Sequence, residues 1–194
     1  AMQVVASTGL LDGNSVFSES QTIWTRANFL ELRRCFIDRP LLGPEPYLEK
    51  LEQQLRDATD PAIQLMAELH FVHLLVPRPI HGKTKRELIS MILGMMRSPA
   101  PLPADLGRVL DHGFINPGMY YTTRRDAQIR FLIEFGETWT QLETEDRARL
   151  FADPWDFKRA VYADPDSGAF AQRDALLHLL FPDTFESRSE ERRV

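Results

Sequence analysis

The chain has 194 residues, a formal net charge of −5 and a sequence pI of about 5.6. Apolar residues make up 43% and charged residues 26%, a composition typical of one globular domain and not of a disordered or fibrous chain. The acidic balance excludes an overall basic field for holding a phosphate backbone, so nucleic-acid binding would need a local basic patch.

The first 20 residues contain Gly9, Gly13 and several serines and threonines, which predicts a flexible lead-in. The single cysteine, Cys35, has no internal partner for a disulfide, and the chain opens with no secretory signal pattern. No apolar run approaches the roughly 20 residues that span a bilayer. We therefore expect a cytoplasmic protein with no membrane partner.

From Ile23 onward, apolar residues recur at three- and four-residue spacing, as on one face of a helix. Such stripes lie within the ranges 48–55, 65–72, 88–95 and 131–139. We predict an all-α fold: a single compact domain over 21–187 with eight or nine helices and at most a short hairpin near 114–123. The charged residues 188–194 are interpreted as the start of a linker.

Several helix boundaries can be predicted from local chemistry. Asp60-Pro61 and Asp153-Pro154 each place a capping side chain before a proline at the first helical position. Pro77, Gly113 and Pro182 follow apolar stretches and predict helix ends. Residues 97–105 hold three prolines and are either a hinge or a loop within one continuous bundle; we favour the continuous bundle because each half alone would be small.

The triplet Gly82-Lys83-Thr84 resembles the end of a phosphate-binding P-loop. A P-loop needs a glycine five positions before Gly82, where the backbone curls around the phosphates with its N–H groups. Pro77 occupies that position, and the preceding stretch has a helical pattern where a strand is required. We predict an ordinary helix start here and no nucleotide site.

Other candidates for chemistry have structural alternatives. His70 and His73 lie three residues apart, as metal ligands on a helix can, but no second cluster of ligands follows, so a buried histidine pair is favoured. Cys35 is expected to be a small buried hydrophobe and not a nucleophile. We therefore predict no catalytic, cofactor-binding or metal-binding residue in this chain.

Two stretches, 119–128 and 153–162, combine aromatic and basic side chains, a mixture that can stack on bases and hold phosphates. The nucleic-acid contacts that they predict are Tyr120, Tyr121, Arg124, Arg125, Lys158 and Arg159. The same basic patch could take in Lys83, Lys85 and Arg86. The structural alternative is that Thr123 caps a helix, the tyrosines pack against the core, and Trp155 and Phe157 are core anchors.

The segment "LLHLLFPDTFE" (176–186) resembles the sequence that precedes the AAA+ motor in McrB-like NTPases of modification-dependent restriction systems. Further similar segments run upstream in the same order, and together they cover most of residues 23–187. They are "IWTRANFLEL", "YLEKLEQQL", "LMAELHFVHLLVP" and "DPWDFKRAV".

The resemblance implies that the chain is the N-terminal region of such a protein, followed by a module that binds GTP or ATP with Mg²⁺. It also implies partners: the downstream AAA+ module, a nuclease subunit, or DNA. We expect a non-catalytic helical adaptor or sensor domain that couples to the motor. The alternative is a nucleic-acid-binding module that uses the basic patch.

Overall fold

The structure is a computed structural model and describes residues 2–18, 20–163 and 169–186. Within these ranges it contains eleven α-helices and two π-helical segments, and no strand; the linker predicted at 188–194 lies outside them. The elements are α1 (Met2–Val4), η1 (Val5–Leu11), α2 (Arg26–Leu32), η2 (Arg33–Ile37), α3 (Tyr47–Leu55), α4 (Asp60–Leu74), α5 (Gly82–Leu93), α6 (Ala104–Val109), α7 (Met119–Thr123), α8 (Arg125–Trp139), α9 (Thr144–Ala152), α10 (Pro154–Val161) and α11 (Phe170–Leu180). The predicted all-α class is confirmed, with more and shorter helices than expected.

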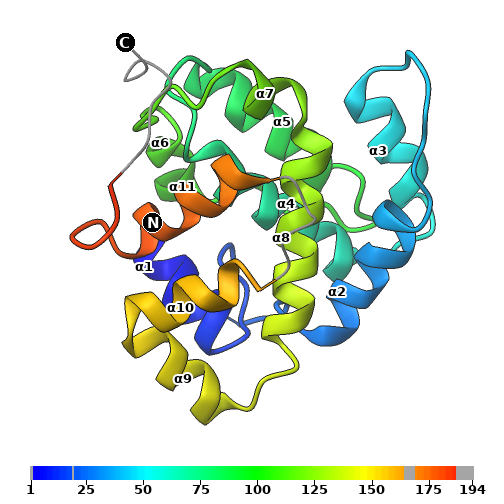
Figure 1. The fold of residues 1–194 in the computed structure, drawn as a ribbon. Helices are drawn as coiled ribbons and strands as arrows, with labels where there is room; N and C mark the ends of the chain where they lie inside the picture. The colour runs from blue at the N-terminus through cyan, green and yellow to red at the C-terminus, as the bar shows by residue number, and fades with distance from the viewer. Residues whose placement is uncertain (1, 19, 164–168, 187–194) are drawn as a thin grey trace.

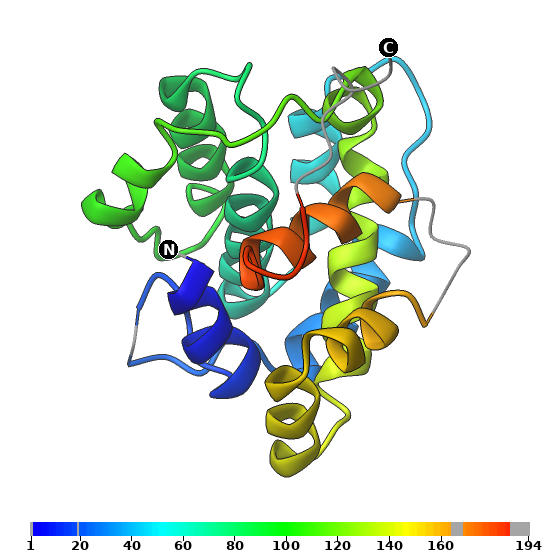
Figure 2. The ribbon, with the colours of Figure 1, turned by 60° about the vertical axis from the view of Figure 1, so that its left-hand side comes forward.

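Helix α4 is the centre of the bundle and packs against α2, α5 and α8 (Figures 1 and 2). Every residue from Ala62 to Leu74 is buried, including the polar side chains of Gln64, Glu68, His70 and His73. The sequence stripe predicted one apolar face, but a helix enclosed on all sides buries its polar positions too. These buried polar groups therefore need partners inside the protein.

The N-terminal segment supplies hydrogen-bond partners for one of these buried groups, Glu68. The prediction of a flexible lead-in over 1–20 is therefore wrong for the part of it that the structure describes. Val5 and Leu10 are buried in the core. The Leu10 carbonyl accepts a 2.7 Å hydrogen bond from the Trp139 indole, and the Val16 N–H donates to Glu68 at 2.9 Å. Glycine and serine content had suggested mobility, but apolar anchors and a buried carboxylate fix this segment.

The short hairpin allowed near 114–123 is absent, and this region forms helix α7 instead. Gly118 precedes the helix with φ of 86°, a conformation that favours glycine, and the chain then turns into α7. The nearest approach to a strand is an isolated bridge between Pro77 and Ile115. Helix α7 places Tyr121 in the core.

The predicted cap at Asp153 is confirmed, since its carboxylate accepts from the N–H groups of Trp155 and Asp156. At α4 the capping residue is Thr59, and Asp60 occupies the first helical position. The Asp60 carboxylate instead accepts from the N–H groups of Arg97 and Ser98, at 2.8 and 3.0 Å. This ties the proline-rich stretch 97–105 to the central helix, as expected for a continuous bundle.

Candidate functional site

The predicted nucleic-acid patch divides into two distant groups. Helix α7 and the start of α8 lie at one end of the molecule, and α10 lies at the other in both views (Figures 1 and 2). Tyr121 is fully buried, and its hydroxyl, which has one hydrogen to donate, lies 2.9 Å from the His73 carbonyl oxygen and 2.7 Å from Oε1 of Gln172. Tyr121 is thus a core residue, as the structural alternative predicted, while Tyr120 is exposed.

Arg124 and Arg125 also separate, although they are adjacent in sequence. Arg124 is exposed and pairs with Asp126, with Nε 3.3 Å from the carboxylate, which raises the arginine pKa. The Arg125 guanidinium lies over the Tyr47 ring, 5.1 Å from its centroid, and burial lowers its pKa. Only Arg124 of this pair presents its charge to solvent as predicted.

Helix α10 uses its charges locally. Arg159 forms an ion pair with Asp156, and the Lys158 ammonium lies 5.3 Å from the centroid of the Trp155 ring. Phe157 is the core anchor that the sequence predicted, but Trp155 is 56% exposed. These contacts form one solvated helix surface and add nothing to the patch at α7 and α8.

Helix α5 begins at Gly82, so the Gly-Lys-Thr triplet is a helix start, as predicted. Lys83 is exposed and lies 3.8 Å from Glu87, and Arg86 pairs with Asp111. Lys85 points inward and is buried. The three basic residues therefore do not share a surface.

His70 and His73 are both buried in α4, and each has at least one ring nitrogen within hydrogen-bond distance of a protein atom. His70 Nδ1 lies 2.7 Å from the Met66 carbonyl and Nε2 lies 2.8 Å from the Tyr47 hydroxyl, so Nδ1–H donates and Nε2 accepts. His73 stacks on Tyr121 with ring centroids 4.5 Å apart. Burial lowers the pKa of each histidine to about 3. In the described ranges, no group of three or more His, Cys, Asp or Glu side chains is placed to hold a metal ion.

Cys35 lies in η2 and is buried, as predicted, and burial raises the pKa of its thiol. A thiol needs access and a lowered pKa to act as a nucleophile. Neither condition holds for Cys35.

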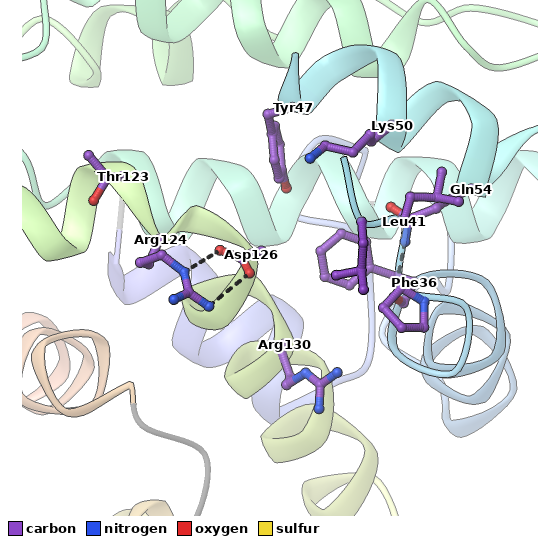
Figure 3. A pocket seen from close by; sticks show the side chains of 11 residues that line it. Phe36, Leu41, Tyr47, Lys50, Gln54, Thr123, Arg124, Asp126 and Arg130 are labelled. Atoms are coloured by element: carbon purple, nitrogen blue, oxygen red, sulfur yellow. Dashed lines mark hydrogen bonds and ion pairs between the residues drawn. The ribbon is translucent and has the colours of Figure 1, made fainter. Parts of the chain in front are cut away.

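The structure does provide a pocket of about 440 Å³ beside Arg124, between the loop 38–46, α3 and α8 (Figure 3). Its lining residues are Phe36, Pro40, Leu41, Leu42, Tyr47, Lys50, Gln54, Thr123, Arg124, Asp126 and Arg130. We call it the α3–α8 pocket. It combines three basic side chains, one acidic side chain and several apolar ones.

Hydrogen bonds fix the walls of the α3–α8 pocket. The Gln54 amide donates to the carbonyls of Phe36 and Arg39, at 3.1 and 2.9 Å, which holds the loop against α3. The Lys50 ammonium donates to the Gly43 carbonyl at 3.1 Å. Across the pocket, Arg124, Asp126 and Arg130 project from the start of α8 (Figure 3).

The sequence prediction missed most of this site. Leu42 is 92% exposed at the pocket, and Lys50 and Arg130 contribute charges that lie far from one another in the sequence. The available signal was "RPLLGPEP" (39–46), in which two leucines stand in a loop rich in proline and glycine. Two adjacent leucines in a loop, outside any helical repeat of apolar residues, indicate apolar side chains that do not pack in the core.

Comparison with known proteins gives no relative: no family model, no curated protein and no solved structure matches this chain. In the part of the chain that the structure describes, no helix has both the length and the apolar character to cross a membrane.

Proposed function

We propose that this chain is a non-catalytic helical adaptor or sensor domain that binds a segment of a partner protein in the α3–α8 pocket. The observation that carries the proposal is Leu42, which is 92% exposed next to the pocket's basic side chains. Leu41, which is 38% exposed, also lines the pocket, so the two leucines give it a contiguous apolar edge beside these charges, and such an edge is a common mark of a protein-binding site. The charges of Lys50, Arg124 and Arg130 favour an acidic segment with apolar side chains.

The sequence resemblance supplies the proposed parent, a McrB-like AAA+ NTPase of a modification-dependent restriction system. In that parent, GTP or ATP with Mg²⁺ would bind in the downstream module, and the partner would be that module or a nuclease subunit. Binding at the pocket would shift the loop 38–46 against α8. The side chains of Gln54 and Lys50 hold this loop to α3, so a partner that binds more tightly when these contacts are broken would couple the loop position to a neighbouring module.

The alternative is a nucleic-acid module, and one observation favours it. Tyr120 is 51% exposed, and the Arg124 guanidinium lies 5.9 Å from the centroid of its ring. Such a pair can stack on a base while Lys50 and Arg130 contact phosphates. This smaller surface replaces the dispersed patch that the sequence predicted.

A peptide selection distinguishes the two functions. A display library of short random peptides is selected on the wild-type domain, and the enriched peptides are then tested for binding to each variant. The adaptor proposal expects enriched peptides that combine Asp or Glu with Leu or Phe and that lose binding to Leu42→Asp and Arg130→Glu. Leu30→Asp is the matched control, because Leu30 is an exposed leucine outside this pocket. Enriched peptides that bind Leu42→Asp and Arg130→Glu as tightly as the wild type would reject the pocket as the binding site.

The second arm measures fluorescence anisotropy of single-stranded and double-stranded DNA, methylated and unmethylated, across a salt titration. Binding that weakens steeply with salt and is lost in Arg124→Glu would favour the nucleic-acid module. Absence of binding at low salt, where non-specific attraction is strongest, would leave the protein-binding adaptor.

A further inference from the structure

A second pocket, of about 270 Å³, lies between α3, α4, α5 and the start of α8. We call it the α5 pocket. Its lining residues are Leu48, Leu74, Ile80, Thr84, Lys85, Glu87, Leu88, Met91 and Arg125. Most of the wall is aliphatic, so the pocket suits a hydrocarbon group better than a polar ligand.

The wall of the α5 pocket includes two basic side chains, Lys85 and Arg125, each with a buried nitrogen atom that has no hydrogen-bond partner among the described residues. Lys85 is only 1% exposed, and its ammonium has no hydrogen-bond partner within the described ranges. The Nε of Arg125 is likewise buried and unpartnered among those residues. Buried donors are normally hydrogen-bonded, and a buried charge normally has a counter-charge.

The nearest acidic groups do not neutralise these cations. Asp111 attracts Lys85, but its carboxylate is hydrogen-bonded to Arg86. Glu87 is exposed at the rim, where it pairs with Lys83. The neighbouring imidazoles of His70 and His73 are kept neutral by burial and by the Arg125 charge. The α5 pocket thus has two basic side chains, Lys85 and Arg125, and one acidic side chain, Glu87, in a mainly aliphatic wall.

We propose that the α5 pocket binds a small aliphatic carboxylate. The carboxylate meets Lys85 and Arg125, and the hydrocarbon chain lies along Leu48, Ile80, Leu88 and Met91. One anionic head supplies the missing counter-charge, and an aliphatic tail fits a wall that offers few donors for a sugar or a base. This ligand site is independent of the protein-binding function proposed for the α3–α8 pocket.

Octanoate is the probe, and isothermal titration calorimetry measures its binding at concentrations below micelle formation. We expect saturable binding to the wild type. Octanamide, which keeps the chain but lacks the charge, should bind about tenfold or more weakly, and acetate, which lacks the chain, should not bind measurably. Equal binding of octanoate and octanamide, or no saturable octanoate binding, would overturn the proposal.

Lys85→Met tests the head group because methionine keeps the length and loses the charge. Octanoate binding should weaken about tenfold or more in Lys85→Met and stay unchanged in Lys83→Met, the exposed control on the same helix. Arg125→Gln provides a second variant with the same expected loss, and circular dichroism confirms that each variant is folded. Wild-type affinity in both folded variants would place octanoate elsewhere and sink the proposal.

Discussion

The indole N–H of Trp24 donates a 2.6 Å hydrogen bond to the carboxylate of Glu68, at the centre of the bundle. The same carboxylate accepts from the Ser15 hydroxyl at 2.5 Å and from the Val16 N–H at 2.9 Å. Glu68 therefore joins the N-terminal segment to α4. Burial raises its pKa, although these donors act in the opposite direction.

Glu68→Gln tests this junction. In glutamine an NH2 group replaces one of the two carboxylate oxygens, at a site where Trp24, Val16 and Gln64 all donate, so at least one buried donor loses its acceptor. We expect the free energy of unfolding to fall by about 1–3 kcal/mol, as measured by urea denaturation. Glu52→Gln, at an exposed position, is the control and should change stability by less than about 0.5 kcal/mol. A neutral effect of Glu68→Gln would mean that the carboxyl is protonated in the native protein.

The all-α class and several helix boundaries could be predicted from sequence because they depend on local chemistry. The cap at Asp153 and the helix start at Gly82 involve neighbours within a few residues. The order of residues 2–18 could not be predicted in the same way. Its anchors are Glu68 and Trp139, more than 50 residues away, and only the folded chain brings them together.

The side-chain positions in the candidate site also depend on contacts between distant parts of the chain, so they could not be predicted from the sequence. Arg124 and Arg125 look equivalent in the sequence, yet the first is exposed and the second lies over Tyr47. Helical geometry turns adjacent side chains by about 100°. Which of the two faces solvent depends on where α3 packs, and the exposure of Leu42 depends on how the loop 38–46 crosses that surface.

The buried histidines predict a pH dependence of stability. Burial lowers the pKa of His70 to about 3, whereas an unfolded chain has its usual value near 6.5. Because the unfolded state binds the proton first, the stabilisation is complete above pH 6.5 and is lost as pH falls toward the folded pKa. The contribution of one such group changes by about 1.4 kcal/mol per pH unit between these limits.

His70→Gln removes this contribution. We expect the slope of unfolding free energy against pH, measured by urea denaturation from roughly pH 4 to 6, to be smaller in the variant by about 1.4 kcal/mol per unit. Glu68 titrates in both proteins and cancels in the comparison. His112→Gln, at an exposed position, is the control substitution. Equal slopes for wild type and His70→Gln would show that His70 is charged in the folded protein.

Replacing the buried Lys85 should stabilise the protein, whereas substitutions that remove a contact destabilise it. Burial lowers its pKa to about 8, so the folded state disfavours the ammonium that the unfolded chain carries freely. Replacing it by methionine should raise the free energy of unfolding at pH 7 by about 1–3 kcal/mol. The stability linked to deprotonation is complete above pH 10.5 and is lost as pH falls through 8, so the advantage of the variant should shrink between pH 8 and 10. Lys83→Met is the exposed control, and a destabilised Lys85→Met would indicate that the ammonium has a partner in solution.

Gly136 allows α8 to lie directly against α2, because a Cβ at this position would overlap the buried ring of Phe29. Alanine is the better helix former by about 1 kcal/mol, so an isolated helix would gain from Gly136→Ala. In this bundle we expect the overlap to dominate and the free energy of unfolding to fall by about 1–3 kcal/mol in urea denaturation. Gly107→Ala in α6 is the matched control, since its Cβ would lie 3.4 Å from the flexible Arg86 side chain.

In a double-mutant cycle, Phe29→Leu should recover part of the loss caused by Gly136→Ala. Additive effects of the two substitutions would contradict a direct contact between α2 and α8 at this point.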